Sequence, residues 1–190
     1  VRKGIDQIIQ ASKDNNLMIS LTTNGWFVKK YSDVLKNVSL LNISLDGTEE
    51  THDFIRRKKG SFAKAIEAVK IAKANNIPVL VNTTVMSANI DNIPEMNKLI
   101  KELNVNWSLD AYVEHNVIKE WQKGSNLSRP TNDLFKKVVK EIDDNKNLVN
   151  SDDYLKMITK EKKPPKVCFA GIGYSVISPE GELYPCFPAM

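Results

Sequence analysis

Two short polar clusters, each ending in glycine, are the places where this sequence is best equipped to bind a ligand. Residues 22–25 (Thr-Thr-Asn-Gly) follow one short apolar run, and residues 44–47 (Ser-Leu-Asp-Gly) follow another. Such side chains hydrogen-bond sugar hydroxyls, and Asp46 can accept from two hydroxyls at once. An adjacent glycine lets a ligand approach the backbone. Asn-Gly and Asp-Gly also occur in ordinary turns, so either cluster taken alone favours a turn.

Three charged or ionisable residues follow the second cluster: His52, Asp53 and Arg56. A His-Asp pair is typical of a general base, but no serine or cysteine nucleophile motif accompanies it. Adjacent residues also point in different directions, so we predict a structural or capping role for His52 and Asp53. Arg56 lies just beyond the strand end, where its guanidinium can bind a carboxylate in a bidentate manner.

The two cysteines, Cys168 and Cys186, both lie in the last 23 residues. No secretory signature is present, which favours a reduced compartment and a cytoplasmic location, where paired cysteines are more often metal ligands than a disulfide. Two thiolates flanking a hairpin can bind iron or zinc, but two are too few for a closed site. Two unrelated free cysteines remain an alternative.

The pattern of apolar residues predicts alternating strands and helices. Short apolar runs predict strands at 17–22, 40–45, 77–85 and 105–113. Apolar residues at helical spacing predict helices at 26–35, from Ser61 as N-cap to about 75, and at 93–103, 131–142 and 154–158. Strands separated by helices run parallel, so the sequence predicts an α/β fold, either an open sheet or part of a barrel. In both, ligands collect at the carboxyl ends of the strands.

Composition excludes several classes of protein. Apolar residues make up 42% and charged residues 26% of 190 residues, with a net charge of +4, as expected of a globular chain. No apolar run approaches the roughly 18 residues of a membrane span, and no aromatic-basic cluster indicates nucleic-acid binding. We expect one domain over residues 1–160, a charged linker at 161–167, and a segment at 168–190 that contains a hairpin with a Pro-Glu-Gly turn.

Taken together, these motifs resemble one family. The stretch from Ile43 to Arg56 (ISLDGTEETHDFIR), followed by Gly60-Ser61-Phe62, is similar to the central segment of radical S-adenosylmethionine (SAM) enzymes. It looks most like those with a SPASM or twitch extension, such as anaerobic sulfatase-maturating and peptide-modifying enzymes. Residues 23–25 and 81–85 match the same family, and the tail matches the opening of the extension: a cysteine, twelve residues, then Gly-x-x-x-x-Cys.

The resemblance implies a fold and roles for particular residues. The fold is a partial (β/α)6 barrel that lacks its first strands, followed by a short β-hairpin. In this family the strand-end serine and aspartate hold the SAM ribose and the later arginine binds the SAM carboxylate, which implies Ser44, Asp46 and Arg56. Further implied positions are Asn24 and Asn82 on the cofactor side, backbone near Val113 at adenine, and Cys168 and Cys186 as ligands of an auxiliary [4Fe–4S] cluster.

The sequence also departs from the family. The Cys-x-x-x-Cys-x-x-Cys motif of the catalytic [4Fe–4S] cluster and the Gly-Gly-Glu-Pro segment are absent, so we expect a fragment truncated at both ends and inactive alone. The implied activity of the intact enzyme is reductive cleavage of SAM to a 5′-deoxyadenosyl radical, which abstracts hydrogen from a peptide or protein. A ferredoxin or flavodoxin would supply electrons. The alternatives are a degenerate peptide- or partner-binding module, and a zinc- or nucleotide-binding α/β domain.

Overall fold

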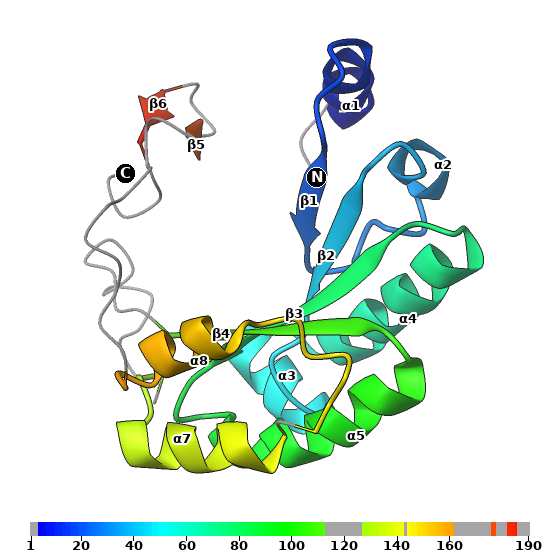
Figure 1. Cartoon of the computed structure of the whole chain (residues 1–190). Coiled ribbons are helices and arrows are strands. Elements are labelled where there is room, and N and C mark those ends of the chain that lie inside the picture. Colours follow the sequence, from blue (N-terminus) through cyan, green and yellow to red (C-terminus); the bar gives the residue numbers. More distant parts are fainter. Residues whose placement is uncertain (1–3, 113–126, 143, 162–175, 178–181, 186–190) are drawn as a thin grey trace.

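The computed structural model describes residues 4–112, 127–142, 144–161, 176–177 and 182–185 (Figure 1). Its elements are, in order, α1 (Ile5–Asp14), β1 (Ser20–Thr23), α2 (Ser32–Leu35), β2 (Leu40–Ser44), α3 (Glu49–Arg56), α4 (Ser61–Ala74), β3 (Val79–Val85), the 3-10 helix η1 (Ile90–Asn92), α5 (Ile93–Leu103), β4 (Asn106–Ala111), α7 (Asn132–Glu141), α8 (Asp152–Ile158), β5 (Val176–Ile177) and β6 (Leu183–Tyr184). Within these residues, no helix has both the length and the apolar character needed to cross a membrane.

The first four strands form a parallel sheet in the order β1-β2-β3-β4. Each strand pairs with the next one along the chain, and helices carry the chain back between them, as in βαβ units. This confirms the predicted α/β fold and fits a partial barrel. The carboxyl ends of all four strands lie along the same edge of the sheet.

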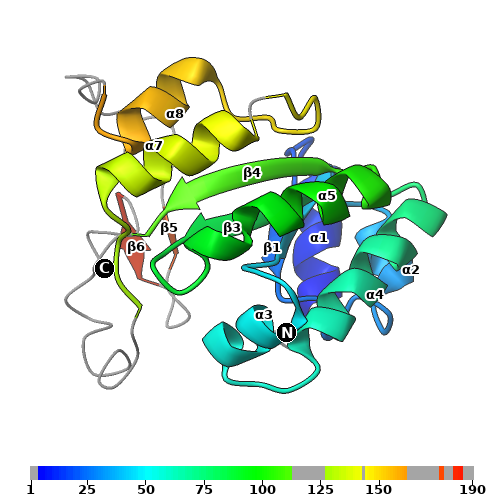
Figure 2. The same cartoon turned by 90° about the horizontal axis from the view of Figure 1, so that it is seen from below.

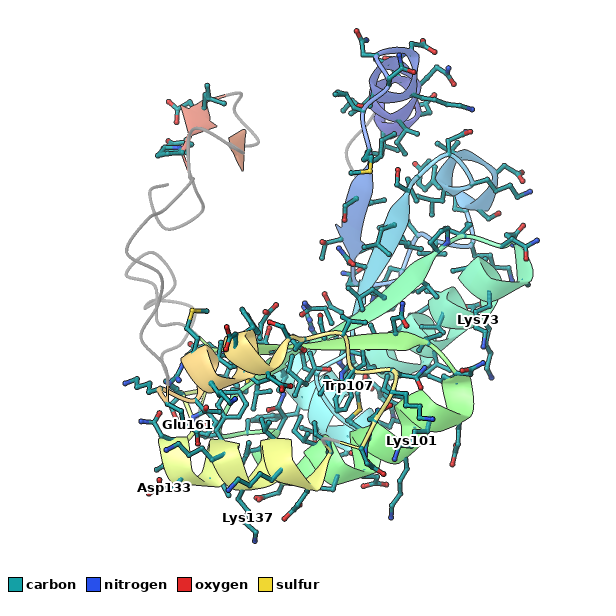
Figure 3. All side chains as sticks on the ribbon, in the orientation of Figure 1. Lys73, Lys101, Trp107, Asp133, Lys137 and Glu161 are labelled. Carbon is teal, nitrogen blue, oxygen red and sulfur yellow. The ribbon has the colours of Figure 1, made fainter. Side chains whose placement is uncertain are left out.

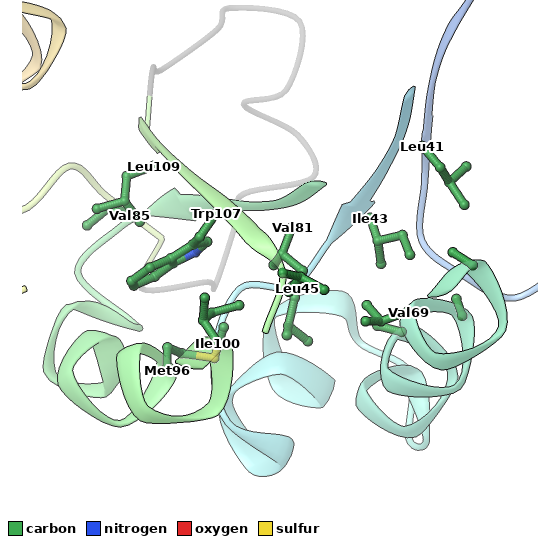
Figure 4. Packing of buried hydrophobic residues seen from close by; sticks show 14 of the residues in the cluster. Leu41, Ile43, Leu45, Val69, Val81, Val85, Met96, Ile100, Trp107 and Leu109 are labelled. Atoms are coloured by element: carbon green, nitrogen blue, oxygen red, sulfur yellow. The ribbon is translucent and has the colours of Figure 1, made fainter. Parts of the chain in front are cut away.

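Helices α3, α4 and α5 cover one face of the sheet (Figures 1 and 2). Alternate strand residues on that face are apolar and buried, among them Leu41, Ile43, Val81, Val85 and Leu109. They pack against the apolar stripes of the helices, shown by Val69, Met96 and Ile100 in Figure 4. Trp107 is fully buried in this core, and its Nε1 donates to Thr83 Oγ1 at 2.8 Å.

The opposite face of the same strands is polar. Since side chains alternate along a strand, the register places Ser44 beside Asn82, Asn82 beside Ser108, and Thr84 beside Asp110. We call this the polar face; it comprises Ser20, Thr22, Asn42, Ser44, Asn82, Thr84, Ser108 and Asp110. Charged side chains such as Lys73, Lys101 and Lys137 lie instead on the outer surfaces of the helices (Figure 3).

The free edge of β4 is covered by residues 147–150, for which the sequence predicted no structure. Trp107 N–H donates to the Asn147 carbonyl at 2.7 Å, and Val149 N–H donates to the Trp107 carbonyl at 2.8 Å. The side chain of Asn150 continues this ladder, accepting from Leu109 N–H at 2.7 Å and donating to the Leu109 carbonyl at 3.0 Å. The chain then enters α8, whose position relative to β4 is fixed by these bonds.

Two local predictions were wrong. The predicted helix at 26–35 is helical only over Ser32–Leu35, and residues 26–31 form consecutive turns. Consecutive turns place every third or fourth side chain on the same side, as a helix does, so the apolar pattern did not distinguish the two. Ser61 is the first residue of α4 and not its N-cap; Gly60 is the cap residue, with φ 84°, and makes no side-chain cap bond. The carboxylate of Asp53 supplies the missing acceptors, at 2.5 Å from Gly60 N and 2.8 Å from Phe62 N.

At the other end of the chain, β5 and β6 pair antiparallel, which confirms the predicted hairpin. The proposed linker and both cysteines fall largely or wholly outside the described residues, so the domain boundaries stay a prediction.

A pair of glycine substitutions tests the close packing behind β1. Gly25 has φ 88°, and a Cβ there would lie 2.8 Å from the Lys64 carbonyl oxygen and 3.0 Å from Ala65 Cα. Gly60 has a similar φ of 84° but open space around the same position. We expect Gly60→Ala to cost about 1–2 kcal/mol from the left-handed backbone, and Gly25→Ala to cost clearly more. Urea unfolding of both variants measures this; equal losses would contradict the packing.

Candidate functional site

The carboxyl ends of β2 and β3 bring together four of the residues that the sequence singled out. Ser44 and Asn82 are register neighbours on the polar face, and both are half-buried. Asp46 follows β2 directly, and Arg56 returns from the last turn of α3 to contact it. Asn82 Nδ2 donates to Ser108 Oγ at 3.1 Å and to Asp110 Oδ2 at 2.8 Å, which fixes the orientation of its amide.

Asp46 is the most constrained residue of this group. It is only 2% exposed, and both carboxylate oxygens are engaged. Oδ1 accepts from Thr84 N–H at 3.0 Å, and Oδ2 lies 2.5 Å from Arg56 Nη2. The side chain of Arg56 is 33% exposed, so the guanidinium binds Asp46 on one side and faces solvent on the other. A ligand carboxylate can therefore reach Arg56 without any movement of Asp46.

The buried side chain of Asn89 holds the same strand ends together and was missed by the sequence reasoning. Its Nδ2 donates to the Asp46 carbonyl at 2.7 Å and to the Thr84 carbonyl at 2.8 Å. Its Oδ1 accepts from Met86 N–H at 2.8 Å. An asparagine in a polar loop is indistinguishable in sequence from an ordinary turn residue, so only the structure identifies this role.

The structure confirms a structural role for His52 and a capping role for Asp53. His52 is 1% exposed, and its Nδ1 accepts from Asp46 N–H at 2.9 Å. Burial lowers the pKa of His52 to about 4, with a further lowering by Arg56 and opposing effects of Asp46 and Asp53. The imidazole is therefore neutral at pH 7 and acts as an acceptor. The backbone N–H bonds from the start of α4, that of Phe62 first, lower the pKa of Asp53.

The other predicted residues are placed differently. Asn24 is exposed after β1, and its Oδ1 accepts from Trp26 N–H at 3.3 Å, which is a turn interaction. Val113, Cys168 and Cys186 lie outside the described residues. Among the residues that are described, no group of three His, Cys, Asp or Glu side chains is arranged to hold a metal ion.

The fold and the site define the class of protein: a parallel α/β sheet with a polar edge at the carboxyl ends of its strands. The sequence model of the Radical SAM superfamily matches residues 1–100. The chain therefore belongs to the radical SAM superfamily, whose members use SAM and a [4Fe–4S] cluster.

Curated relatives include proteins of peptide maturation in Bacillus subtilis (strain 168). The antilisterial bacteriocin subtilosin biosynthesis protein AlbA is 29% identical over 174 residues, covering 88% of this chain and 38% of AlbA. The sporulation killing factor maturation protein SkfB is 39% identical over 98 residues, covering 50% of this chain and 24% of SkfB. The chain thus spans well under half the length of these two relatives.

Solved structures share the fold. Streptococcus suis SuiB bound to S-adenosylmethionine superposes with a TM-score of 0.72 at 16% identity, covering 96% of this chain and 46% of SuiB. SuiB bound to its precursor peptide SuiA gives a TM-score of 0.67 at 15% identity, covering 97% of this chain and 46% of SuiB. At this level of identity the likeness shows the fold alone.

The pKa of His52 gives a prediction for stability. Between about pH 6.5 and pH 4, the unfolded chain binds a proton at His52 that the folded chain excludes. The free energy of unfolding should therefore fall as pH drops through this window. His52→Asn keeps an acceptor oxygen near the Nδ1 position but does not titrate, so its unfolding should depend less steeply on pH. Urea unfolding of both proteins at a series of pH values measures this, and equal pH slopes would contradict a neutral, buried His52.

Proposed function

We propose that these 190 residues are the SAM-holding part of a longer radical SAM enzyme that modifies a peptide or protein. The observation that carries the proposal is the arrangement at the ends of β2 and β3. There the partly exposed side chain of Arg56 is held by a buried carboxylate beside a row of hydroxyl and amide side chains. This arrangement offers a positive group for the methionyl carboxylate and neutral polar groups for the ribose, two polar parts of SAM.

Each residue has a distinct part in this proposal. The exposed side of the Arg56 guanidinium binds the methionyl carboxylate, and Ser44 Oγ bonds a ribose hydroxyl from the polar face. Asn82 stands next to Ser44 with its amide already oriented by Ser108 and Asp110, so it lines the same side of the site. Asn24 lines the neighbouring strand end, and backbone near Val113 contacts adenine.

Asp46 contributes to SAM binding chiefly through Arg56. The carboxylate is buried and both oxygens have partners, so a ribose hydroxyl can share Oδ2 only where the guanidinium leaves room. A carboxylate that holds the guanidinium in place removes the entropy cost of ordering that long side chain when SAM binds.

The residues present fit SAM but do not fit the catalytic cluster. That cluster supplies the electron that cleaves SAM when it is bound, and the family holds it with three thiolates. The chain contains two cysteines, so the ligands of that cluster must be sought outside these residues. A Cys-x-x-x-Cys-x-x-Cys motif in the encoded sequence before Val1 supports the enzyme; an intact gene without one favours a peptide-binding module instead.

The proposed substrate is a peptide, because relatives that share much of this chain are named for peptide products. AlbA is a bacteriocin biosynthesis protein, SkfB a maturation protein, and SuiB has been solved with its precursor peptide. We propose that Cys168 and Cys186 belong to a SPASM- or twitch-type extension and ligate an auxiliary [4Fe–4S] cluster. A ferredoxin or flavodoxin is the proposed electron donor.

Substitutions at Arg56 test the SAM site. In the full-length protein, Arg56→Ala should weaken binding of S-adenosylhomocysteine, which keeps the carboxylate and ribose, by about 1–3 kcal/mol for a lost charge-assisted bond. Lys59→Ala is the matched control, since it removes the same charge from the turn that follows α3 without removing a partner of Asp46. Calorimetric titration measures both. Equal affinities for Arg56→Ala and wild type would refute the assignment.

A double-mutant cycle then separates the two roles of Asp46. If Asp46 acts through Arg56, Asp46→Asn weakens binding in the wild-type background and has little further effect in Arg56→Ala. A loss that persists undiminished in Arg56→Ala points to a direct ribose contact. Ser44→Ala should weaken binding of S-adenosylhomocysteine in both backgrounds, because its proposed contact does not involve the guanidinium.

The auxiliary cluster is tested by iron content. After anaerobic reconstitution of the full-length protein, replacement of both Cys168 and Cys186 by alanine should remove one cluster's iron and leave the barrel cluster intact. Iron and sulfide quantitation with electron paramagnetic resonance measures the two populations. Unchanged iron per chain in the double variant would show that these cysteines hold no cluster.

A further inference from the structure

A second carboxylate, Asp110 on β4, lies on the polar face two strands away from Asp46. Its Oδ1 accepts from Tyr154 Oη at 2.5 Å, and its Oδ2 accepts from Asn82 Nδ2 at 2.8 Å. Both partners are neutral donors, and within the described residues Asp110 has no ion-pair partner. Both oxygens of this half-buried carboxylate are therefore oriented by hydrogen bonds, and no ion pair among the described residues compensates its charge.

The orientation of Asp110 is built into the fold. Residues 147–150 pair with the edge of β4, and Ser151 then caps α8 through Tyr154 N–H at 3.2 Å. Leu155 and Ile158 bury the opposite side of α8 in the core. Tyr154 is therefore held on a short, anchored helix, and burial followed by the bond to Asp110 raises the pKa of its phenol above the usual range. The hydroxyl stays protonated and serves as a fixed donor.

We propose that Asp110, set by Tyr154 and Asn82, is a specificity-determining residue that binds a cationic side chain, a lysine or arginine, of the peptide substrate. A carboxylate has about four acceptor positions, and the two neutral donors occupy two of them. The remaining positions and the whole negative charge are available to an ammonium or guanidinium group. The proposal rests on the proposed function, since it assumes that a peptide enters the polar face.

The geometry separates Asp110 from the Arg56 end of the proposed SAM site. Neighbouring strands lie about 4.8 Å apart, so β2 and β4 are about 10 Å apart across the sheet. The amino group of SAM is attached to the same carbon as its carboxylate, which we assign to Arg56 beyond β2. That ammonium therefore cannot reach Asp110, and the sulfonium offers no N–H for an oriented acceptor. The cation that Asp110 suits is one brought by the substrate.

Paired peptide pools test the proposal on the full-length protein. One pool of decapeptides carries lysine at a fixed central position, and the other carries norleucine, which has a side chain of similar shape without the charge. Binding is measured by fluorescence anisotropy with and without saturating S-adenosylhomocysteine. We expect wild type to prefer the lysine pool by about tenfold, the size of one charge-assisted bond, and Asp110→Asn to abolish the preference.

Two further variants keep the test specific. Tyr154→Phe removes one orienting donor and should reduce the preference partway, and Asp133→Asn, which removes an exposed charge from α7 (Figure 3), should leave it intact. Circular dichroism melts confirm that each variant is folded. A wild type without the lysine preference, or a preference that survives Asp110→Asn, overturns the proposal. So does a loss of S-adenosylhomocysteine binding in Asp110→Asn that is larger than the loss in Asn82→Ala, because an effect exerted through Asn82 alone cannot exceed removal of Asn82, and the carboxylate would then serve the cofactor directly.

The experiment distinguishes failure of the proposed function from failure of this inference. If wild type does not bind S-adenosylhomocysteine but keeps a lysine preference that depends on Asp110, the SAM assignment is wrong and the peptide subsite stands.

Discussion

The buried carboxylate of Asp46 joins three parts of the molecule, namely β2, β3 and α3. It accepts from the backbone of β3 at Thr84, pairs with Arg56 at the end of α3, and has its own backbone N–H bound by His52. Removing a carboxylate from water costs several kcal/mol unless charge and hydrogen bonds replace the lost hydration. Here they do so only if β2, β3 and α3 keep one arrangement, so the carboxylate specifies geometry more than it adds stability.

The contacts of Asp46 also keep the apolar and the polar side chains on opposite faces of the sheet. The side-chain period of a strand is two, so a slip of one residue between β2 and β3 would carry the hydroxyl and amide side chains of one of these strands into the helical core. The bond from Thr84 N–H to Asp46, and the bridge of Asn89 across the same two strand ends, are possible in one register only. Ser44 therefore stays beside Asn82, and the polar side chains stay on one surface.

The sequence predicted the parallel α/β fold and the clustering at β2 and β3 because both follow from local patterns. Apolar runs mark strands, and carboxyl ends of parallel strands share an edge. What it could not predict depends on contacts between distant residues. The ladder of Asn150 on β4 spans 41 positions, and the bond between Tyr154 and Asp110 spans 44. No local pattern distinguishes these side chains from others on a loop or a helix surface.

The capping of α4 shows the same limit on a smaller scale. Sequence rules place the cap acceptor at the helix start, and Ser61 satisfied them. The actual acceptor is Asp53, seven residues earlier than Gly60, because α3 folds back and brings its carboxylate to the free N–H groups. The sequence did favour a structural role for the His-Asp pair, since no nucleophile accompanied it, and the structure divides that role into a cap for α4 and an acceptor for Asp46.

The distribution of charge on the polar face follows from these contacts. Asp46 and Asp110 flank Thr84 on the two neighbouring strands, one bonded to its backbone and the other beside it in register. Arg56 neutralises the first, while the partners of the second among the described residues are a phenol and an amide. A carboxylate without an ion pair among the described residues makes the local potential negative. The two carboxylates at this edge of the sheet therefore differ: the charge of Asp46 is paired with Arg56 inside the fold, and the charge of Asp110 is the one that the proposed substrate cation would meet.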